Sequence, residues 1–293
     1  MDVDCGKPVK IIIGRHGYIA NELIRVLESR GEEFISTSRK EEKDGILKLD
    51  LRKPEADFYS RAPRGSLVYM LASISSPEMC SKEPEFARIV NVDATCSFID
   101  NCLIKGLRVC FASTDAIFGL NQGTCFDETT AHPLGPSAEM KAEVERHFLP
   151  YKEFKTVRFS YVLSGHDKFS LYLKECAEKR QVALIYDPFI RSVIGLQDVV
   201  IGLINLDKKW SEMPSAINFC GREVVSRKAL AMAFKKTYES SLEFKITEAP
   251  NSFFKERART IITESTYFSR LLGKSTSTIE ETYSYYLNLE KNE

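Results

Sequence analysis

The sequence predicts an α/β protein built on a doubly wound parallel sheet, with a smaller C-terminal lobe. Two observations predict this fold class. In the first half of the chain, short apolar runs alternate with longer segments of helical period, which is typical of successive βαβ units. After about residue 165 the alternation becomes irregular. We therefore expect a first domain over residues 1–165, with a return segment at about 190–220 that packs with it, and a lobe formed mainly by residues 166–293.

Short apolar runs bounded by turn residues mark the strands of the predicted sheet. They occupy residues 9–14, 32–38, 45–50, 66–73, 107–113 and 154–160. The first helix is predicted from residue 18, with Ile19, Leu23 and Leu27 on one face, and Gly31 ends it.

A longer helix is predicted over residues 83–106, and another over 137–149. The apolar side chains of the longer helix recur every four residues, at Phe86, Val90, Ala94 and Phe98. A stripe of this period predicts that one face of the helix packs against the sheet.

The composition excludes several classes of function. Lysine plus arginine and aspartate plus glutamate number 41 each in 293 residues, so neither nucleic acid nor an acidic membrane is an expected partner. The sequence shows no apolar run of membrane-spanning length and no signal-peptide pattern. Its eight cysteines form no C-x-x-C pair, which is typical of reduced thiols in a cytoplasmic protein without a metal centre. We therefore expect a small-molecule partner.

A glycine-rich loop lies between the first strand and the first helix. Gly14, Gly17 and Ala20 form a G-x-x-G-x-x-A pattern there. The glycines allow a tight turn and the close approach of a pyrophosphate to the helix N-terminus, whose partial positive charge favours the anion. The loop therefore predicts a dinucleotide cofactor.

The end of the second strand lacks the acidic residue that would hold an adenosine 2′-hydroxyl. The chain has Thr37, Ser38, Arg39 and Lys40 there instead. Hydroxyls and cations suit a 2′-phosphate, so we predict NADP(H) in preference to NAD(H), with Arg15 stacking on the adenine or adding to that site. The alternative is a solvated turn without a ligand.

Four later segments extend the pattern in chain order. They are "KLDL" at 48–51, "FASTDAIFG" at 111–119, "FDETTAHPLGPSAEMKAEVE" at 126–145 and "FIRSVIGLQDVVIGL" at 189–203. With these segments the chain resembles the extended short-chain dehydrogenase/reductases, the NAD-dependent epimerase/dehydratase superfamily, and within it the dTDP-4-dehydrorhamnose reductase branch. The resemblance covers nearly the whole chain. It implies a Rossmann sheet, a nucleotide-diphosphate sugar as substrate, and a homodimer formed through the central helices.

The resemblance also implies roles for individual residues. Together with the loop and the second strand, it gives the expected cofactor-binding residues as Gly14, Arg15, Gly17, Tyr18, Ala20, Ser38, Arg39, Asp50, Leu71, Ala72, Asn91 and Lys141. Asp50 falls on the aspartate that meets the adenine amine in the family. The expected substrate-binding residues are Ser73, Asp115 and Arg191, and the expected catalytic residues are Thr114, Ser137 and Lys141.

The chain departs from the family at the proton donor. Relatives carry a tyrosine four residues before the lysine, and this chain has Ser137 four residues before Lys141. A phenol titrates near pH ~10 and is tuned towards neutrality by an adjacent ammonium, whereas an aliphatic hydroxyl is a far weaker acid. In addition, Asp115 is followed by Ala116, where the 4,6-dehydratases of the family carry a glutamate. Dehydration is therefore not expected.

Two interpretations of this departure stay open. The first is an NADP(H)-dependent reductase or epimerase of a nucleotide-diphosphate keto sugar with an atypical active site. A water held by Ser137 and Thr114, a substrate hydroxyl, His166, or a displaced Tyr151 or Tyr161 would then supply the proton. The second is an inactive cofactor-binding protein that contacts a partner enzyme, similar to the regulatory β subunit of methionine adenosyltransferase.

Overall fold

The computed structural model describes residues 7–40, 45–54 and 56–292, and the chain divides into two compact units. The first unit consists of Met1–Thr114, Gly135–Arg158 and Ser211–Ile217. The second unit consists of Asp115–Leu134, Phe159–Trp210 and Asn218–Glu293.

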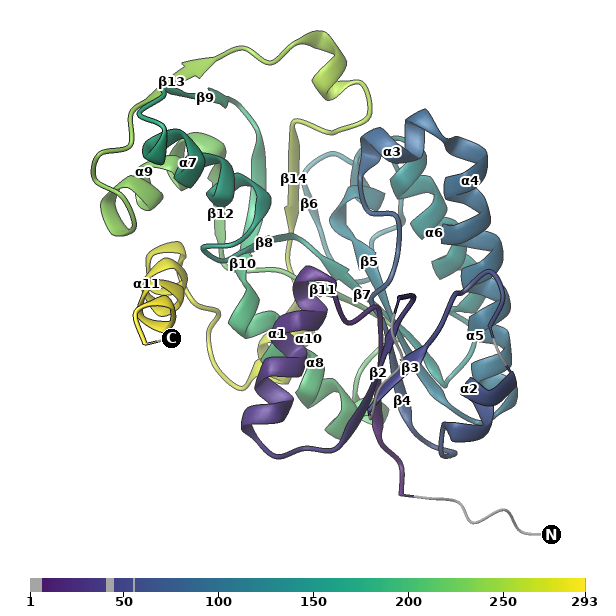
Figure 1. Cartoon of the computed structure of the whole chain (residues 1–293). Coiled ribbons are helices and arrows are strands. Elements are labelled where there is room, and N and C mark those ends of the chain that lie inside the picture. Colours follow the sequence, from purple (N-terminus) through teal and green to yellow (C-terminus); the bar gives the residue numbers. More distant parts are fainter. Residues whose placement is uncertain (1–6, 41–44, 55, 293) are drawn as a thin grey trace, which may run out of the picture. The chain divides into compact units, whose positions relative to one another are not determined.

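The first unit is built on a seven-stranded sheet with the strand order β11-β7-β5-β4-β1-β2-β3 (Figure 1). The strands are β1 (Lys10–Ile13), β2 (Phe34–Ser38), β3 (Ile46–Lys48), β4 (Leu67–Met70), β5 (Arg108–Thr114), β7 (Phe154–Phe159) and β11 (Ala216–Phe219). Strand β1 pairs in parallel with both β2 and β4, so the chain runs outward to β3 and then returns to the other side of β1. This reversal confirms the predicted doubly wound sheet, and the six predicted strand segments coincide with β1 to β5 and β7.

Helices cover both faces of this sheet. They are α1 (Tyr18–Ser29), α2 (Ala56–Arg61), α3 (Pro77–Lys82), α4 (Pro84–Arg88), α5 (Thr95–Ile104) and α6 (Pro136–Phe148). Figure 1 shows α1 on one face and α2 and α5 on the other. Within α1, Leu23 and Leu27 are fully buried, and Gly31 follows the helix with a φ of +62°, as the sequence predicts.

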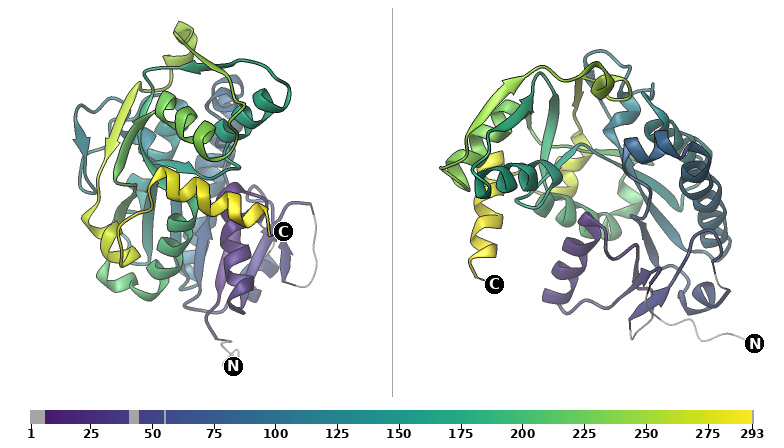
Figure 2. Two further views of the ribbon diagram at one scale, coloured as in Figure 1. Left: turned by 90° about the vertical axis from the view of Figure 1, so that its left-hand side faces the viewer. Right: turned by 45° about the horizontal axis from the view of Figure 1, so that its top comes forward.

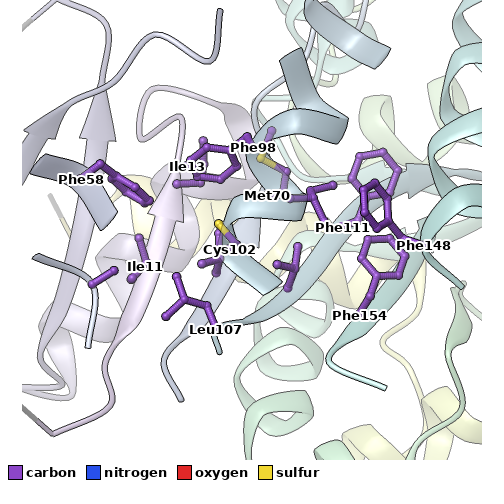
Figure 3. Close-up of a cluster of buried hydrophobic side chains, with 14 of the residues drawn as sticks. Ile11, Ile13, Phe58, Met70, Phe98, Cys102, Leu107, Phe111, Phe148 and Phe154 are labelled. Atoms are coloured by element: carbon purple, nitrogen blue, oxygen red, sulfur yellow. The ribbon is translucent and has the colours of Figure 1, made fainter. Parts of the chain in front are cut away.

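A large apolar core lies between the sheet and the helices α2, α5 and α6 (Figure 3). Ile11 and Ile13 of β1 enter this core, together with Phe98 of α5 and Phe148 of α6. Because side chains alternate along a strand, Ile12 faces the other side of the sheet, where it is also fully buried. A strand buried on both faces needs a continuous apolar run, which is why β1 is recognisable in the sequence.

The predicted helix over residues 83–106 is interrupted by a π-helical turn, η1 (Ile89–Ala94), between α4 and α5. The Thr95 hydroxyl donates to the Val90 carbonyl across this turn, at 2.9 Å. The wider turn shifts the helix face, so the four-residue repeat does not form one buried stripe: Phe98 is fully buried whereas Phe86 is 38% exposed. The chain is helical from Pro84 to Ile104, as predicted, but the prediction that the four-residue repeat forms one buried face is wrong.

The described residues of the second unit form two further sheets and five α-helices. A five-stranded sheet has the order β12-β10-β14-β6 with β8 paired to β10, and β13 pairs with β9. Its strands are β6 (Thr124–Cys125), β8 (Tyr161–Leu163), β9 (Ala183–Tyr186), β10 (Ile190–Gly195), β12 (Glu223–Ser226), β13 (Phe244–Thr247) and β14 (Thr260–Thr263). Its α-helices are α7 (Lys168–Glu178), α8 (Leu196–Lys208), α9 (Arg227–Thr237), α10 (Thr266–Leu272) and α11 (Ile279–Glu290).

The core of the second unit forms around α7, α9 and α11, and Figure 2 shows α11 beside α9. Leu173, Phe234 and Tyr283 are fully buried there. Among the described residues, no helix is both long and apolar enough to cross a membrane. The same part of the chain holds no group of histidine, cysteine and acidic side chains that is arranged to bind a metal ion.

Candidate active site

The glycine loop of the first unit approaches the segment that follows β4. Gly14 has a φ of +86°, and a Cβ at this position would lie 2.9 Å from the Cβ of Ala72. Both the backbone angle and the close approach therefore require glycine. The Gly17 N–H donates to the Gly14 carbonyl at 2.9 Å, which closes the turn before α1.

The end of β2 holds this loop in place. The Gly14 N–H donates to Thr37 Oγ1 at 3.0 Å, and the Arg15 N–H donates to the Thr37 carbonyl at 3.0 Å. The Arg15 side chain donates to Ser36 Oγ at 3.2 Å. The hydroxyls of β2 therefore fix the loop. The only sign of this role in the sequence is that these residues stand at the end of a strand.

The N-terminus of α1 provides a place for an anion. Gly17 is its N-cap, and within the described residues no side chain caps this end. The first turn of the helix contains Tyr18 and the fully buried Ala20, and it carries no acidic residue. Uncapped backbone N–H groups and the positive end of the helix dipole together favour a bound phosphate group.

Ser38 ends β2, Arg39 follows it, and Asp50 lies two residues beyond the end of β3. Ser38 Oγ lies 3.3 Å from His16 Nε2 and accepts the Lys40 N–H at 3.1 Å. Arg39 is exposed and lowers the pKa of the Asp50 carboxyl only slightly. That pKa falls to about 2 mainly because the Arg52 side chain donates hydrogen bonds to the carboxylate, at 2.6 Å for the shortest.

Asn91 fixes the segment that contains Leu71, Ala72 and Ser73. Its Oδ1 accepts the Ile74 N–H at 2.8 Å, and its Nδ2 donates to the Ile74 carbonyl at 3.0 Å. Asn91 is buried in the π-helical turn η1, so this irregular turn aims the carboxamide at the segment after β4. Through its bonds to Ile74, Asn91 therefore fixes the segment that contains two other predicted cofactor-binding residues, Leu71 and Ala72, and the predicted substrate-binding Ser73.

Lys141 is anchored at the carboxyl end of β5. Its Nζ donates to the Ala112 carbonyl at 2.7 Å and lies 4.5 Å from the ring centroid of Phe111. Thr114 ends the same strand, and Ser137 lies one helical turn before Lys141 on α6. The predicted catalytic residues therefore belong to two adjoining elements, and Phe111 is a contact that sequence reasoning missed.

Burial lowers the pKa of Lys141 to about 8, while the nearby Glu145 carboxylate partly opposes this effect. Glu145 is buried in an ion pair with Arg158 at 2.8 Å and accepts the Thr156 hydroxyl at 3.2 Å. Because the folded-state pKa lies below the usual value, charged Lys141 disfavours folding. This cost is fully present below pH 8 and fades as the pH rises to about 10.5.

Other groups predicted as replacement proton donors have partners of their own. In the second unit, Tyr161 donates to Asp167 Oδ1 at 2.6 Å, and burial followed by this carboxylate raises the pKa of the phenol well above its usual value. His166 Nε2 lies 3.1 Å from Glu290 Oε1. Tyr151 is 45% exposed beyond the end of α6.

Arg191 and Asp115 lie side by side in the second unit, with Arg191 Nε 3.9 Å from Asp115 Oδ2. The other guanidinium nitrogens donate to backbone carbonyls at 2.6 to 3.3 Å, those of Ile190, Ala258 and Arg259. The predicted pair of substrate-binding residues is therefore brought together, with the guanidinium fixed by the backbone.

Arg227 shares one aromatic ring with Arg191 and a second ring with Arg257, and sequence reasoning missed both Arg227 and Arg257. The guanidinium carbons of Arg191 and Arg227 lie 4.2 and 4.6 Å from the centroid of the Phe189 ring. Arg227 and Arg257 lie 5.7 and 4.9 Å from the centroid of Phe253. Burial is the main cause that lowers the pKa of both Arg191 and Arg227, and the neighbouring guanidinium groups lower it further. We call these three side chains the arginine cluster.

Several solved structures share the fold of this chain at low sequence identity. MoeE5 in complex with UDP-glucose and NAD has a TM-score of 0.81 and 18% identity, covering 97% of this chain and 99% of that chain. TunA, an NAD-dependent NDP-hexosamine 5,6-dehydratase of tunicamycin biosynthesis, has a TM-score of 0.81 and 20% identity over 98% and 99%. A hypothetical dTDP-4-dehydrorhamnose reductase from Sulfolobus tokodaii has a TM-score of 0.79 and 20% identity over 93% and 98%. No curated protein matches the sequence.

These structures overturn the predicted preference for NADP(H) over NAD(H). MoeE5 holds NAD and TunA is NAD-dependent, so the prediction is wrong. Its physical basis also fails in part, because Thr37 Oγ1 accepts the Gly14 N–H and Ser38 Oγ is engaged with His16 and Lys40.

The family itself follows from the sequence match. The model of the RmlD substrate binding domain matches residues 10–259, which span most of both units. This match confirms the predicted resemblance to the dTDP-4-dehydrorhamnose reductase branch of the epimerase/dehydratase superfamily. The chain belongs to the RmlD substrate-binding-domain family.

Proposed function

We propose that the chain is an NAD(H)-dependent reductase or epimerase of a nucleotide-diphosphate keto sugar, with an atypical active site that has Ser137 in place of the usual tyrosine. The observation that carries the proposal is the anchoring of Lys141 Nζ 2.7 Å from the Ala112 carbonyl, close to Thr114. Burying an ammonium costs free energy. The presence of a lysine with a buried ammonium beside the end of β5, despite this cost, supports the proposal that the site uses the positive charge of Lys141.

The first unit fits a dinucleotide cofactor. The space beside Gly14 is too small for a Cβ, and the uncapped end of α1 offers N–H groups to a pyrophosphate. Lys141 would hold the nicotinamide ribose, and Thr114 and Ser137 would bind the carbonyl oxygen of the sugar. When bound, NAD(H) supplies or accepts the hydride at the carbonyl carbon. NAD(H) is proposed because MoeE5 and TunA, which share the fold, use it.

The Gly14→Ala variant is expected to bind NADH at least ~10-fold more weakly and to lose about 1–3 kcal/mol of stability, because of backbone strain and the contact with Ala72. Gly31→Ala is the matched control, since Gly31 also has a positive φ but a Cβ there meets nothing within 4 Å. Gly31→Ala should lower stability but leave NADH affinity unchanged. NADH fluorescence titration and urea unfolding of both variants check this, and equal affinities would contradict it.

The arginine cluster is proposed to hold the diphosphate of the substrate. Three guanidinium groups share two aromatic rings, and like charges held this close favour a multiply charged anion between or beside them. The complex of MoeE5 with UDP-glucose supports a nucleoside diphosphate as the anion.

Arg227→Met should weaken UDP binding by about 1.5–3 kcal/mol, the usual range for a hydrogen bond to a charged group. Arg222→Met is the control. Arg222 precedes β12, whereas Arg227 follows it, and the exposed Arg222 guanidinium lies 3.8 Å from the Glu281 carboxylate. Calorimetric titration with UDP measures both variants. Equal UDP affinities for the two variants would show that the arginine cluster does not bind the diphosphate.

The second candidate is an inactive cofactor-binding protein that acts on a partner enzyme. Ser137 is the observation that favours it, since a serine hydroxyl does not replace a phenol as an acid. A homodimer through the central helices and a cytoplasmic location also stay predictions. The exposed Phe86 and Ile89, on α4 and η1, offer apolar surface for such a dimer.

The two candidates are separated by incubating the protein with NADH and a panel of nucleotide-diphosphate 4-keto sugars. The proposed function predicts that NADH binds and that at least one sugar is reduced or epimerised. Tight NADH binding without any change in the sugars would favour the regulatory candidate.

A further inference from the structure

Lys141 has hydrogen-bonding capacity beyond the one contact that anchors it. An ammonium carries three N–H donors, and within the described residues the Ala112 carbonyl takes one of them. The residue as a whole is half-buried, and burial of its ammonium is the main cause that lowers its pKa. Ser137 lies one helical turn before Lys141 and ends at Oγ, one bond beyond its Cβ, so its hydroxyl reaches less far from α6 than a phenol at this position would.

Other acids near the catalytic segment are poorly placed to donate a proton. Of the two histidines in the first unit, His16 contacts Ser38 and His147 is exposed near the end of α6. Glu139 lies on the same turn of α6 as Ser137, but it is exposed.

We propose that Lys141 is itself the proton donor of the reaction, an inference that rests on the proposed function. In the reductive direction, a hydride from NADH reaches the carbonyl carbon of the sugar and a proton reaches its oxygen. The Nζ–H bond of Lys141 breaks as the O–H bond forms, which leaves a neutral amine. The amine then takes a proton back from water, so the lysine is restored and the alcohol is the product.

The electrostatics of the site suit this role. A free lysine titrates near ~10.4 and is a weak acid at neutral pH. Burial lowers the pKa of Lys141 to about 8, close to the range in which a general acid works best. The groups that act against this shift are Glu145 on α6 and Cys80 on α3. Glu145 is neutralised by Arg158, and the buried Cys80 thiol donates to the Ile74 carbonyl at 3.4 Å.

The test compares the full-length protein with Lys141→Arg over a range of pH. An arginine keeps the positive charge but does not release a proton in this range. NADH affinity should therefore stay within about threefold, while kcat falls by on the order of 10². The unmodified protein should lose kcat about tenfold per pH unit above pH ~8, and this limb should be absent from the variant.

Direct titration supplies a readout that does not depend on turnover. The ¹³Cε resonance of Lys141, assigned by its loss in Lys141→Arg, should titrate near pH ~8. Titration above pH ~10, or a Lys141→Arg enzyme that keeps its kcat and its alkaline limb, would overturn the inference while the proposed function stands. An unmodified protein that binds NADH but changes no sugar would overturn the proposed function itself, and the inference with it.

Discussion

Replacing Ser137 with tyrosine is expected to raise kcat for sugar reduction by on the order of 10². The substitution puts a phenol one helical turn before Lys141, whose ammonium lies at the end of β5 beside Thr114. A nearby cation lowers the pKa of a phenol and so makes it a better acid near neutral pH. Steady-state NADH oxidation at pH 7 measures the change.

The control for this variant is Ser137→Phe, which adds the same ring without the hydroxyl. A gain seen with tyrosine and not with phenylalanine assigns the effect to proton donation. If both variants gain equally, the ring acts by packing, and position 137 is not where the substrate oxygen lies. If neither gains, the segment at the start of α6 does not reach the substrate.

Replacing Glu145 with alanine is expected to lower the free energy of unfolding by about 3–5 kcal/mol. Glu145 and Arg158 are both almost fully buried, with 2.8 Å between Oε2 and the guanidinium. Removing the carboxylate leaves a guanidinium charge inside the protein without its counter-ion, which is the costly way to break a buried pair. Urea unfolding followed by circular dichroism measures the loss.

The same helix provides a matched control. Glu143 forms a bidentate pair with Arg88 at 2.7 and 2.8 Å, but both side chains are exposed. Exposed ion pairs contribute about 0–1 kcal/mol, so Glu143→Ala should be nearly neutral. Similar losses for the two variants would mean that burial does not decide the strength of these pairs.

The parts of the fold that follow from local pattern were predictable. Strand β1 was recognisable because burial on both faces requires a continuous apolar run, and α1 because Leu23 and Leu27 share one face before Gly31. The π-helical turn at Asn91 was not predictable from period alone. The repeat from Phe86 to Phe98 fits an unbroken α-helix, and nothing in that spacing shows the extra residue in the turn.

The roles of the site residues were harder to predict from the sequence, for a related reason. Thr37 and Ser38 were interpreted as ligands of a 2′-phosphate because residue type alone does not show where a hydroxyl points. In the structure Thr37 accepts the Gly14 N–H, so it holds the loop. The arginine cluster was missed because its members are far apart in sequence and are brought together in the fold, around the rings of Phe189 and Phe253.

The central claim is that a member of this family without the usual tyrosine still transfers hydride. The most direct test incubates the unmodified protein with 4-deuterated NADH and nucleotide-diphosphate 4-keto sugars, followed by mass spectrometry of the sugars. The account predicts that at least one sugar gains a deuterium on its former carbonyl carbon. NADH that binds to the protein while no sugar of the panel acquires deuterium would contradict it and leave a cofactor-binding protein without redox chemistry.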